Sequence, residues 1–184
     1  MDGHSLAMTL IGFPVLWHNK TTVKKGDVGE SIVDAFLMSK NVVPYRPVFY
    51  GAHPFDRLLA TPDKKSLFLA DVKTKARRNY YPDTGIDIKH YNDYLFIQNK
   101  YHIKAFIFFV DESVLKIYGG WLSEISKPTA IVHNGKHIDY PLIQNGIIYF
   151  PVDLMQDISE ITEEKATELK QLSQRNYEYL EASL

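Results

Sequence analysis

Apolar side chains recur every three to four positions in three stretches of the chain. Residues 26–40 and 87–101 show this spacing over about four turns each, which favours helices with one buried side. Residues 162–180 repeat it with leucines in a highly charged segment that follows a threonine suited to cap a helix. The pattern predicts three helices, the last of them amphipathic.

Short segments rich in β-branched and aromatic residues lie between the helical stretches and are bounded by Gly, Pro and charged turns. Such segments predict β-strands. They are residues 42–50, 55–60, 66–73, 104–111 and 114–119, with weaker strand patterns between 130 and 150. The stretch 104–111 is apolar throughout, as in strands buried on both faces. We therefore predict an α/β fold in which a meander of the first three strands follows the first helix.

Composition limits the class of protein. The chain has 184 residues, 45% of them hydrophobic, which is enough for one domain with a core of its own. No stretch approaches the roughly 18 consecutive apolar residues of a membrane span, and the apolar N-terminal stretch lacks a basic leader. The absence of Cys excludes disulfides and thiolate metal sites. These features predict a soluble, cytoplasmic protein without membrane association.

Charge is distributed unevenly along the chain. The net charge is −1, but from Asp153 onward eight acids face three bases, so the preceding residues are net positive. Such a distribution permits a phosphate-binding face, and the alternative is an ordinary solvated surface. The cations expected to contact nucleic acid are Lys24, Lys25, Lys75, Arg77 and Arg78.

Three regions follow from these patterns. Residues 1–22 are expected to form an N-terminal extension, and the sequence does not decide whether residues 1–7 are native, because Met8 offers an alternative start. Residues 23–152 are expected to form the core domain. Residues 153–184 are expected to form an acidic helical segment that packs on the core or at a dimer interface.

The strand predicted at 66–73 ends in Asp-Val-Lys. Because side chains alternate along a strand, Asp71 and Lys73 lie on one face, roughly 7 Å apart. The preceding strand carries Asp56. Carboxylates that converge at adjacent strand ends supply the hard oxygen ligands that Mg²⁺ or Mn²⁺ accepts. The alternative is a hairpin in which these charges form exposed ion pairs.

A divalent ion at such a site fits phosphodiester hydrolysis, in which negative charge develops on the phosphoryl oxygens. Lys73 would orient or help deprotonate the attacking water, or would hold the phosphate. The cations that follow the strand would lie along the nucleic-acid backbone.

The first helix contributes a further acid. Glu30 lies in line with Val33 and Leu37 on the apolar stripe, so its carboxylate is expected at the edge of the inward face. There it would complete or tune the site. Simple placement near the positive end of the helix dipole is the alternative. Asp27 and Asp34 are competing candidates.

These residues resemble a known family. The order Glu30 on a helix, Asp56 on a strand and Asp71-Val72-Lys73 on the next strand resembles the PD-(D/E)XK nuclease superfamily, especially its Holliday junction resolvase-like members. The resemblance covers roughly residues 24–111. It implies a restriction-endonuclease-like mixed β-sheet flanked by helices, here with a C-terminal amphipathic helix. It also implies that the Val72 carbonyl is a further metal ligand.

One motif departs from the family pattern. The family's first acid usually follows Pro directly, whereas here Phe55 separates Pro54 from Asp56. Asp63 follows Pro62 directly, but it lies in a turn-like segment shortly before Asp71. We therefore expect Asp56 to bind metal and rank Asp63 second.

The expected function is Mg²⁺-dependent hydrolysis of DNA phosphodiester bonds, with Mn²⁺ able to substitute. Because no separate reading module is evident, a structure-selective or partner-directed endonuclease is favoured. RNA is not excluded as a substrate, and a homodimer is one option. The alternatives are a noncatalytic nucleic-acid-binding or protein-binding module on the same scaffold, and a structural protein with a fortuitous Asp-x-Lys.

Two other groups of residues are assigned structural roles. His133 and His137 flank Asn-Gly, which predicts a hairpin turn rather than a metal-binding helix. The tyrosines in and before the second helix are expected to pack in the core or at the sheet edge, with base stacking as the alternative. They are Tyr80, Tyr81, Tyr91 and Tyr94.

Overall fold

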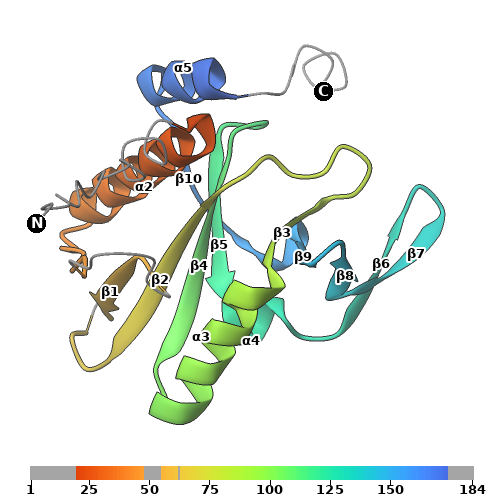
Figure 1. Cartoon of the computed structure of the whole chain (residues 1–184), viewed down its shortest axis with the longest axis horizontal. Coiled ribbons are helices and arrows are strands. Elements are labelled where there is room, and N and C mark those ends of the chain that lie inside the picture. Colours follow the sequence, from red (N-terminus) through yellow and green to blue (C-terminus); the bar gives the residue numbers. More distant parts are fainter. Residues whose placement is uncertain (1–19, 48–54, 62, 174–184) are drawn as a thin grey trace, which may run out of the picture.

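A mixed five-stranded sheet crosses the middle of the molecule (Figure 1). The computed structural model describes residues 20–47, 55–61 and 63–173. The sheet has the order β1-β2-β4-β5-β10, with β2 and β4 parallel and the other neighbours antiparallel. Its strands are β1 (Arg57–Ala60), β2 (Leu67–Thr74), β4 (Lys104–Asp111), β5 (Lys116–Trp121) and β10 (Gln156–Glu160).

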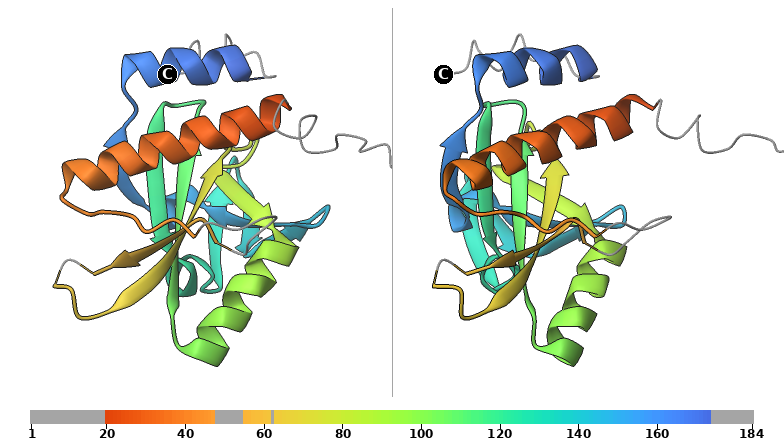
Figure 2. Two further views of the ribbon diagram at one scale, coloured as in Figure 1. Left: turned by 60° about the vertical axis from the view of Figure 1, so that its left-hand side comes forward. Right: turned by 90° about the vertical axis from the view of Figure 1, so that its left-hand side faces the viewer.

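Helices cover both faces of this sheet (Figure 2). The helices α2 (Thr21–Ser39) and α5 (Glu163–Leu172) pack with one face in a first apolar core. The helices α3 (Ile88–Tyr101) and α4 (Leu122–Ile125) pack with the other face in a second core. The predicted α/β fold, with a mixed sheet flanked by helices and a C-terminal amphipathic helix, is confirmed.

Strand β4 separates the two cores. Phe106 and Phe108 belong to the core under α2, whereas Ile107 and Phe109 belong to the core under α3. This alternation explains why its sequence is apolar at every step, and it confirms the predicted strand at 104–111. Helix α5 buries Ala166 and Leu169 in the α2 core, so the described part of the tail packs on the body of the molecule.

Two smaller sheets extend beyond α3. One contains β3 (Asp83–Asp87), β9 (Ile147–Pro151) and β8 (Leu142–Gln144), and a 3₁₀ turn, η1 (Val152–Leu154), follows it. The other is the hairpin of β6 (Thr129–His133) and β7 (Lys136–Tyr140), which projects to the right in Figure 1. Asn134 and Gly135 form its turn with positive φ. The prediction that His133 and His137 flank a hairpin turn is confirmed.

The strand predicted at 42–50 is wrong as far as the structure describes it. Pro44 and Pro47 remove backbone donors that a paired strand needs. Tyr45 forms a single antiparallel bridge with Leu58 at the free edge of β1, and residues 48–50 lie outside the described residues. The meander is therefore reduced to the β1–β2 hairpin plus one bridge.

Two strands were missed from the sequence. Residues 83–87 form β3, where no strand was predicted. Residues 156–160 form β10 at the edge of the main sheet, within the segment predicted to be helical. Both strands are short and polar, and pairing with distant partners defines them. The last helix begins at Glu163, and residues 174–180 lie outside the described residues.

The first helix begins at Thr21, five residues before the predicted start. No helix in the described ranges is long and apolar enough to cross a membrane.

Helix α2 crosses β2 closely at Gly29. A Cβ built on Gly29 would lie 1.8 Å from Thr74 Oγ1 and 2.9 Å from Thr74 Cβ. Only a residue without a side chain permits this approach, which sets the distance between the helix and the strand. Glu30, next to Gly29, is thereby held beside the β1–β2 hairpin.

Replacing Gly29 with Ala is expected to lower the free energy of unfolding by about 1–3 kcal/mol, because the new methyl group must displace α2 from β2. Gly26→Ala in the same helix is the matched control. A Cβ there has nothing within 4 Å, so the gain in helix propensity should stabilise the protein by about 0.5–1 kcal/mol. Urea unfolding measures both changes, and equal stability of the two variants would contradict the close approach.

Candidate functional site

Strand β2 presents Asp71 and Lys73 on the face that packs toward α3. Leu69 of the same face lies in the α3 core, and the intervening Ala70 and Val72 lie in the α2 core. Asp71 is 4% exposed, and its Oδ2 forms an ion pair with Lys73 Nζ at 2.7 Å. The alternation of strand side chains thus brings the acid and the amine together, one buried and the other at the surface.

The surroundings of Asp71 raise the pKa of its carboxyl group. Burial raises the pKa of Asp71 to about 7, Lys73 opposes this rise, and Asp56 adds to it. The Tyr94 hydroxyl of α3, itself 1% exposed, donates a hydrogen bond to the Asp71 carboxylate. Asp71 Oδ2 is buried, and no directed hydrogen bond from the described residues reaches it beyond the Lys73 ion pair.

Asp56 stands just before β1, across the hairpin from Asp71. Its Oδ2 accepts a hydrogen bond from the Val72 N–H at 2.8 Å. This bond is possible because the β1–β2 register begins at Arg57 opposite Ala70, so the Val72 N–H lies beyond the paired residues. The charge of Asp56 raises the pKa of both Asp71 and Glu30, so it acts on both carboxyls. The hairpin therefore fixes Asp56 between the strand acid and the helix acid.

Glu30 faces the hairpin from α2. Burial raises its pKa, and Asp56 adds to the rise, while Arg57 and Arg46 lower it. Arg57 is fully buried and donates to the Glu30 backbone carbonyl at 3.1 Å and to Glu30 Oε2 at 3.3 Å. Its Nε also pairs with Asp34. Arg57, the first residue of β1, thus links this strand to the acids of α2.

The competing acids occupy other surroundings. Asp34 is shared by Arg57 and Arg46, and Asp27 is exposed on α2. Asp63 lies in the β1–β2 turn, where Oδ1 accepts from Thr61 Oγ1 at 2.6 Å and from the Lys65 N–H at 3.2 Å. Among the acids considered for the site, Glu30, Asp56 and Asp71 are the ones that the structure brings together.

The basic residues after β2 are mostly engaged. Arg77 Nε lies 2.7 Å from Asp111 Oδ2, and its guanidinium stacks on Tyr118. Arg78 donates from Nε to Asp83 Oδ1 at 2.6 Å and lies between two tyrosine rings. Both guanidinium groups therefore serve the fold, whatever they contact in a complex.

The lysines differ from one another. Lys25 pairs with Glu112 at 2.5 Å, whereas Lys24 is exposed on α2. Lys75 is partly buried, and none of the described carboxylates forms an ion pair with it. Lys75 and Lys24 are thus the cations of the predicted set that remain available to a ligand.

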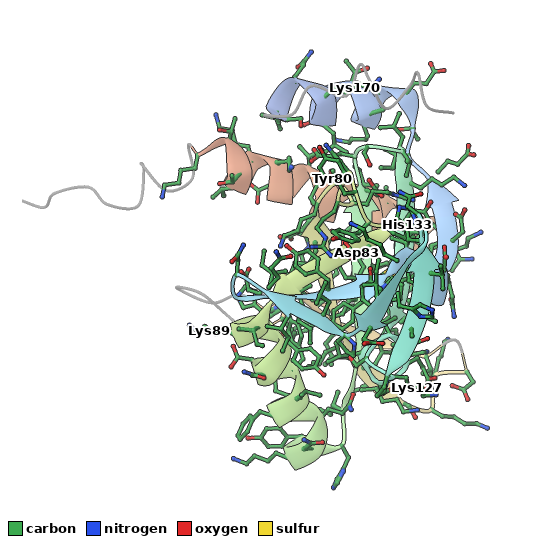
Figure 3. The ribbon with its side chains drawn as sticks, turned by 90° about the vertical axis from the view of Figure 1, so that its right-hand side faces the viewer. Tyr80, Asp83, Lys89, Lys127, His133 and Lys170 are labelled. Atoms are coloured by element: carbon green, nitrogen blue, oxygen red, sulfur yellow. The ribbon has the colours of Figure 1, made fainter. Side chains whose placement is uncertain are left out.

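Asp83 anchors the smaller sheet to this region. It is fully buried and accepts bonds from Arg78 and from the Tyr140 hydroxyl at 2.7 Å. Figure 3 views the molecule from the side of the β6–β7 hairpin and marks Asp83 near its centre. The residues that follow β2 are therefore held by a buried ion pair.

Three residues near the site were not assigned to it from the sequence. Arg57 directly follows Asp56, and an arginine that opens a short apolar strand could have suggested a buried ion pair. Tyr94 was expected to pack in the core, as it does, but its bond to Asp71 depends on how α3 docks. His90 lies one turn before Tyr94, and burial and Lys73 lower its pKa.

The carboxylates do not form a closed metal site. Residues 20–47, 55–61 and 63–173 contain no group of three His, Asp or Glu side chains close enough to hold an ion. The donors nevertheless suit Mg²⁺ or Mn²⁺, because they are oxygens and no described residue makes a directed hydrogen bond to Asp71 Oδ2. A cation there would also relieve the repulsion from Asp56. Asp56 and Asp71 therefore fit a divalent ion. The Glu30 carboxylate is instead engaged by an ion pair with Arg57.

Comparisons with known proteins find similarity to solved structures but not to known sequences. No family model matches the chain, and no curated protein sequence matches it. One similar solved structure is Hjc, a Holliday junction resolvase from Archaeoglobus fulgidus. The likeness has a TM-score of 0.47 at 9% identity and covers 72% of this chain and 96% of that chain. At this level the likeness carries no conclusion about activity.

Proposed function

We propose that this protein is a divalent-metal-dependent nuclease of the PD-(D/E)XK type that hydrolyses phosphodiester bonds of DNA. The observation that carries the proposal is the buried Asp71, whose ionised form is disfavoured by burial and by Asp56. Among the described residues, Lys73 is the partner of its Oδ2. A carboxylate in that state is stabilised by a divalent cation. Perturbed acids of this kind, arranged beside a lysine, are typical of catalytic sites.

Each residue has a defined role in this proposal. Asp56 and Asp71 hold Mg²⁺, for which Mn²⁺ substitutes, and the Val72 carbonyl is proposed as a further ligand. Once bound, the ion supplies Lewis-acid stabilisation of the charge that develops on the phosphoryl group. Glu30 tunes the site through its repulsion with Asp56.

Lys73 serves the attacking water. Its side chain is 17% exposed, so it is partly accessible from the surface, and its ion pair with Asp71 holds it in place. Tyr94 fixes the orientation of Asp71 and the apolar α3 core limits water around it. In this arrangement Lys73 would orient the attacking water beside the two carboxylates, and hydrolysis depends on such positioning.

The nucleic acid is proposed to pass along the surface beyond β2. Lys24 and Lys75 are the available cations, whereas Lys25, Arg77 and Arg78 are each held by an acid. The three paired cations still add to the long-range electrostatic attraction of DNA. The direct contacts are proposed to be to backbone phosphates. Contacts to the backbone rather than to bases fit a structure-selective or partner-directed endonuclease. A homodimer and a cytoplasmic location remain proposals.

A noncatalytic binding module on the same scaffold is the second candidate. The ion pair between Lys73 and Asp71 favours it, because a structural pair would also account for both residues. Such a module would bind DNA with the same affinity with and without a divalent ion.

Cleavage of labelled DNA tests the proposal. Single-stranded, duplex, flapped and four-way-junction substrates, with matched RNA strands, are incubated with Mg²⁺, with Mn²⁺ or with EDTA. The proposal expects cleavage of DNA that requires the ion, and the best substrate names the subclass. DNA binding without cleavage of any substrate would instead favour the noncatalytic module.

A further inference from the structure

A polar pocket lies beside the candidate site, between the end of β2 and the smaller β3-β9-β8 sheet. Its volume is about 260 Å³. Its polar walls come from four separate segments: α2, the residues after β2, β3 and the residue after β4. They are Lys25, Lys75, Arg78, Thr84 and Glu112, and Tyr149 of β9 forms an apolar wall.

The position of Lys75 relates this pocket to Asp71 and Lys73. Asp71, Lys73 and Lys75 occupy every second position, and Lys75 directly follows the last residue of β2. Continuing the strand geometry places successive members on one face, roughly 7 Å apart. The charge of Lys73 lowers the pKa of Lys75, as expected for neighbouring ammonium groups. The pocket therefore begins at Lys75, two positions after Lys73, the residue that is proposed to serve the attacking water.

No carboxylate in the described part of the chain forms an ion pair with Lys75. Burial lowers its pKa, and Asp87 attracts it without forming an ion pair. A partly buried ammonium of this kind is stabilised by an anion brought by a ligand.

Thr84 supplies a second, independent observation. Its side chain is 4% exposed and lines the pocket, and its hydroxyl has no hydrogen-bond partner among the described residues. Buried hydroxyl groups are rarely left unpaired, and each such group costs free energy unless a ligand or water completes it. The Thr84 hydroxyl is thus a candidate donor to a ligand in the pocket that Lys75 also lines.

The remaining walls fix the charge of the pocket. Arg78 is immobilised by Asp83 and lies 3.8 Å from the centre of the Tyr149 ring, so its guanidinium is a fixed cation. Lys25 neutralises Glu112 across the pocket through an ion pair of 2.5 Å. Asp83 likewise balances the charge of Arg78, so Lys75 is the lining cation whose charge no described carboxylate balances through an ion pair.

We propose that this pocket binds a phosphate group of DNA adjacent to the one that is cleaved, with Lys75 and the Thr84 hydroxyl as its direct ligands. This inference rests on the proposed nuclease function, because the adjacent phosphate is defined by cleavage beside Asp71. It adds Thr84, which comes from the smaller sheet, to the residues that hold the substrate. The phosphate is either internal to a strand or terminal, and both sources present the same anion.

Binding measured without turnover tests the subsite. The full chain is titrated in EDTA into a labelled single-stranded oligodeoxynucleotide at several salt concentrations, with Lys75→Ala, Thr84→Val and the exposed-lysine control Lys136→Ala. We expect Lys75→Ala to weaken binding roughly tenfold and to reduce the slope of log K against log salt by about one. Thr84→Val should weaken binding with the slope unchanged, and Lys136→Ala should match the wild type.

Stability separates a ligand role from a structural one. Thr84→Val removes an unpartnered hydroxyl while it keeps the shape of the side chain, so its melting temperature should equal or exceed that of the wild type. Weaker DNA binding by a protein of undiminished stability supports a direct contact. A repeat with 5′-phosphate, 5′-hydroxyl and 3′-phosphate ends identifies the source, because a terminal site loses its Lys75 effect when that end phosphate is absent.

The results for the subsite and for the nuclease are distinguishable. If the wild type cleaves DNA but both pocket variants bind as it does at every salt concentration, the subsite is overturned and the nuclease proposal stands. If the pocket variants show the expected losses but no substrate is cleaved, a phosphate site exists and the nuclease proposal fails. A wild type that does not bind DNA overturns both.

Discussion

Replacing Lys73 with Ala is expected to slow DNA cleavage about 10²–10⁴-fold, the usual contribution of a positioned proton-transfer group. Lys73 is the amine in contact with Asp71, at 2.7 Å, and its side chain is partly accessible to a substrate. The loss should appear mainly in kcat, because Lys24 and Lys75 still hold the DNA. The measurement is the single-turnover rate at saturating enzyme and Mg²⁺.

Lys65→Ala is the matched control for this prediction. Lys65 is exposed in the turn of the same β1–β2 hairpin, so its removal changes the net charge equally without touching Asp71. We expect the rate of Lys65→Ala to stay within about twofold of the wild type. Comparable rates for Lys73→Ala and Lys65→Ala would show that the lysine of Asp-Val-Lys is structural.

Replacing Asp71 with Asn is expected to stabilise the protein without metal at high pH, although the change abolishes activity. The folded protein raises the pKa of Asp71 from 3.8 to about 7, so the folded state binds this proton more tightly than the unfolded state. Stability from this group is therefore present at low pH and is lost as the pH rises toward 7. Asn cannot ionise, so the variant escapes that loss.

The size of the effect follows from the shift. A rise of about three pKa units corresponds to up to about 4 kcal/mol at pH 8, and to little difference near pH 4. Urea unfolding in EDTA at both pH values measures it. Asp63→Asn is the control, because Asp63 is exposed in the hairpin turn and should show no such gain at pH 8. A wild type that becomes more stable than Asp71→Asn as the pH rises would contradict the assigned state of Asp71.

Local patterns predicted the parts of the fold that carry the site. The apolar alternation of β4 and the helical spacing of α2 and α3 are properties of short segments, so they are readable without knowledge of the fold. The same holds for the shared face of Asp71 and Lys73, which follows from strand geometry alone. The strand predicted at 42–50 failed because its prolines outweighed its β-forming residues.

Long-range contacts account for what was missed. Strand β3 exists because it pairs with β9, more than sixty residues later, and β10 exists because it pairs with β5. The roles of Arg77 and Arg78 depend on Asp111 and Asp83, so a run of positive charge in the sequence became a pair of buried structural contacts. The role of Arg57 likewise depends on the packing of α2 against the hairpin, since its partners Glu30 and Asp34 come from that helix.

Calorimetric titration with Mn²⁺ tests the central claim most directly, because it asks whether Asp56 and Asp71 hold an ion and does not require a known substrate. The wild type and Asp63→Ala are expected to bind one equivalent with equal affinity, whereas Asp56→Ala and Asp71→Ala are expected to lose measurable binding. Retention of binding by Asp56→Ala, or its loss in Asp63→Ala, would contradict the assignment of the site.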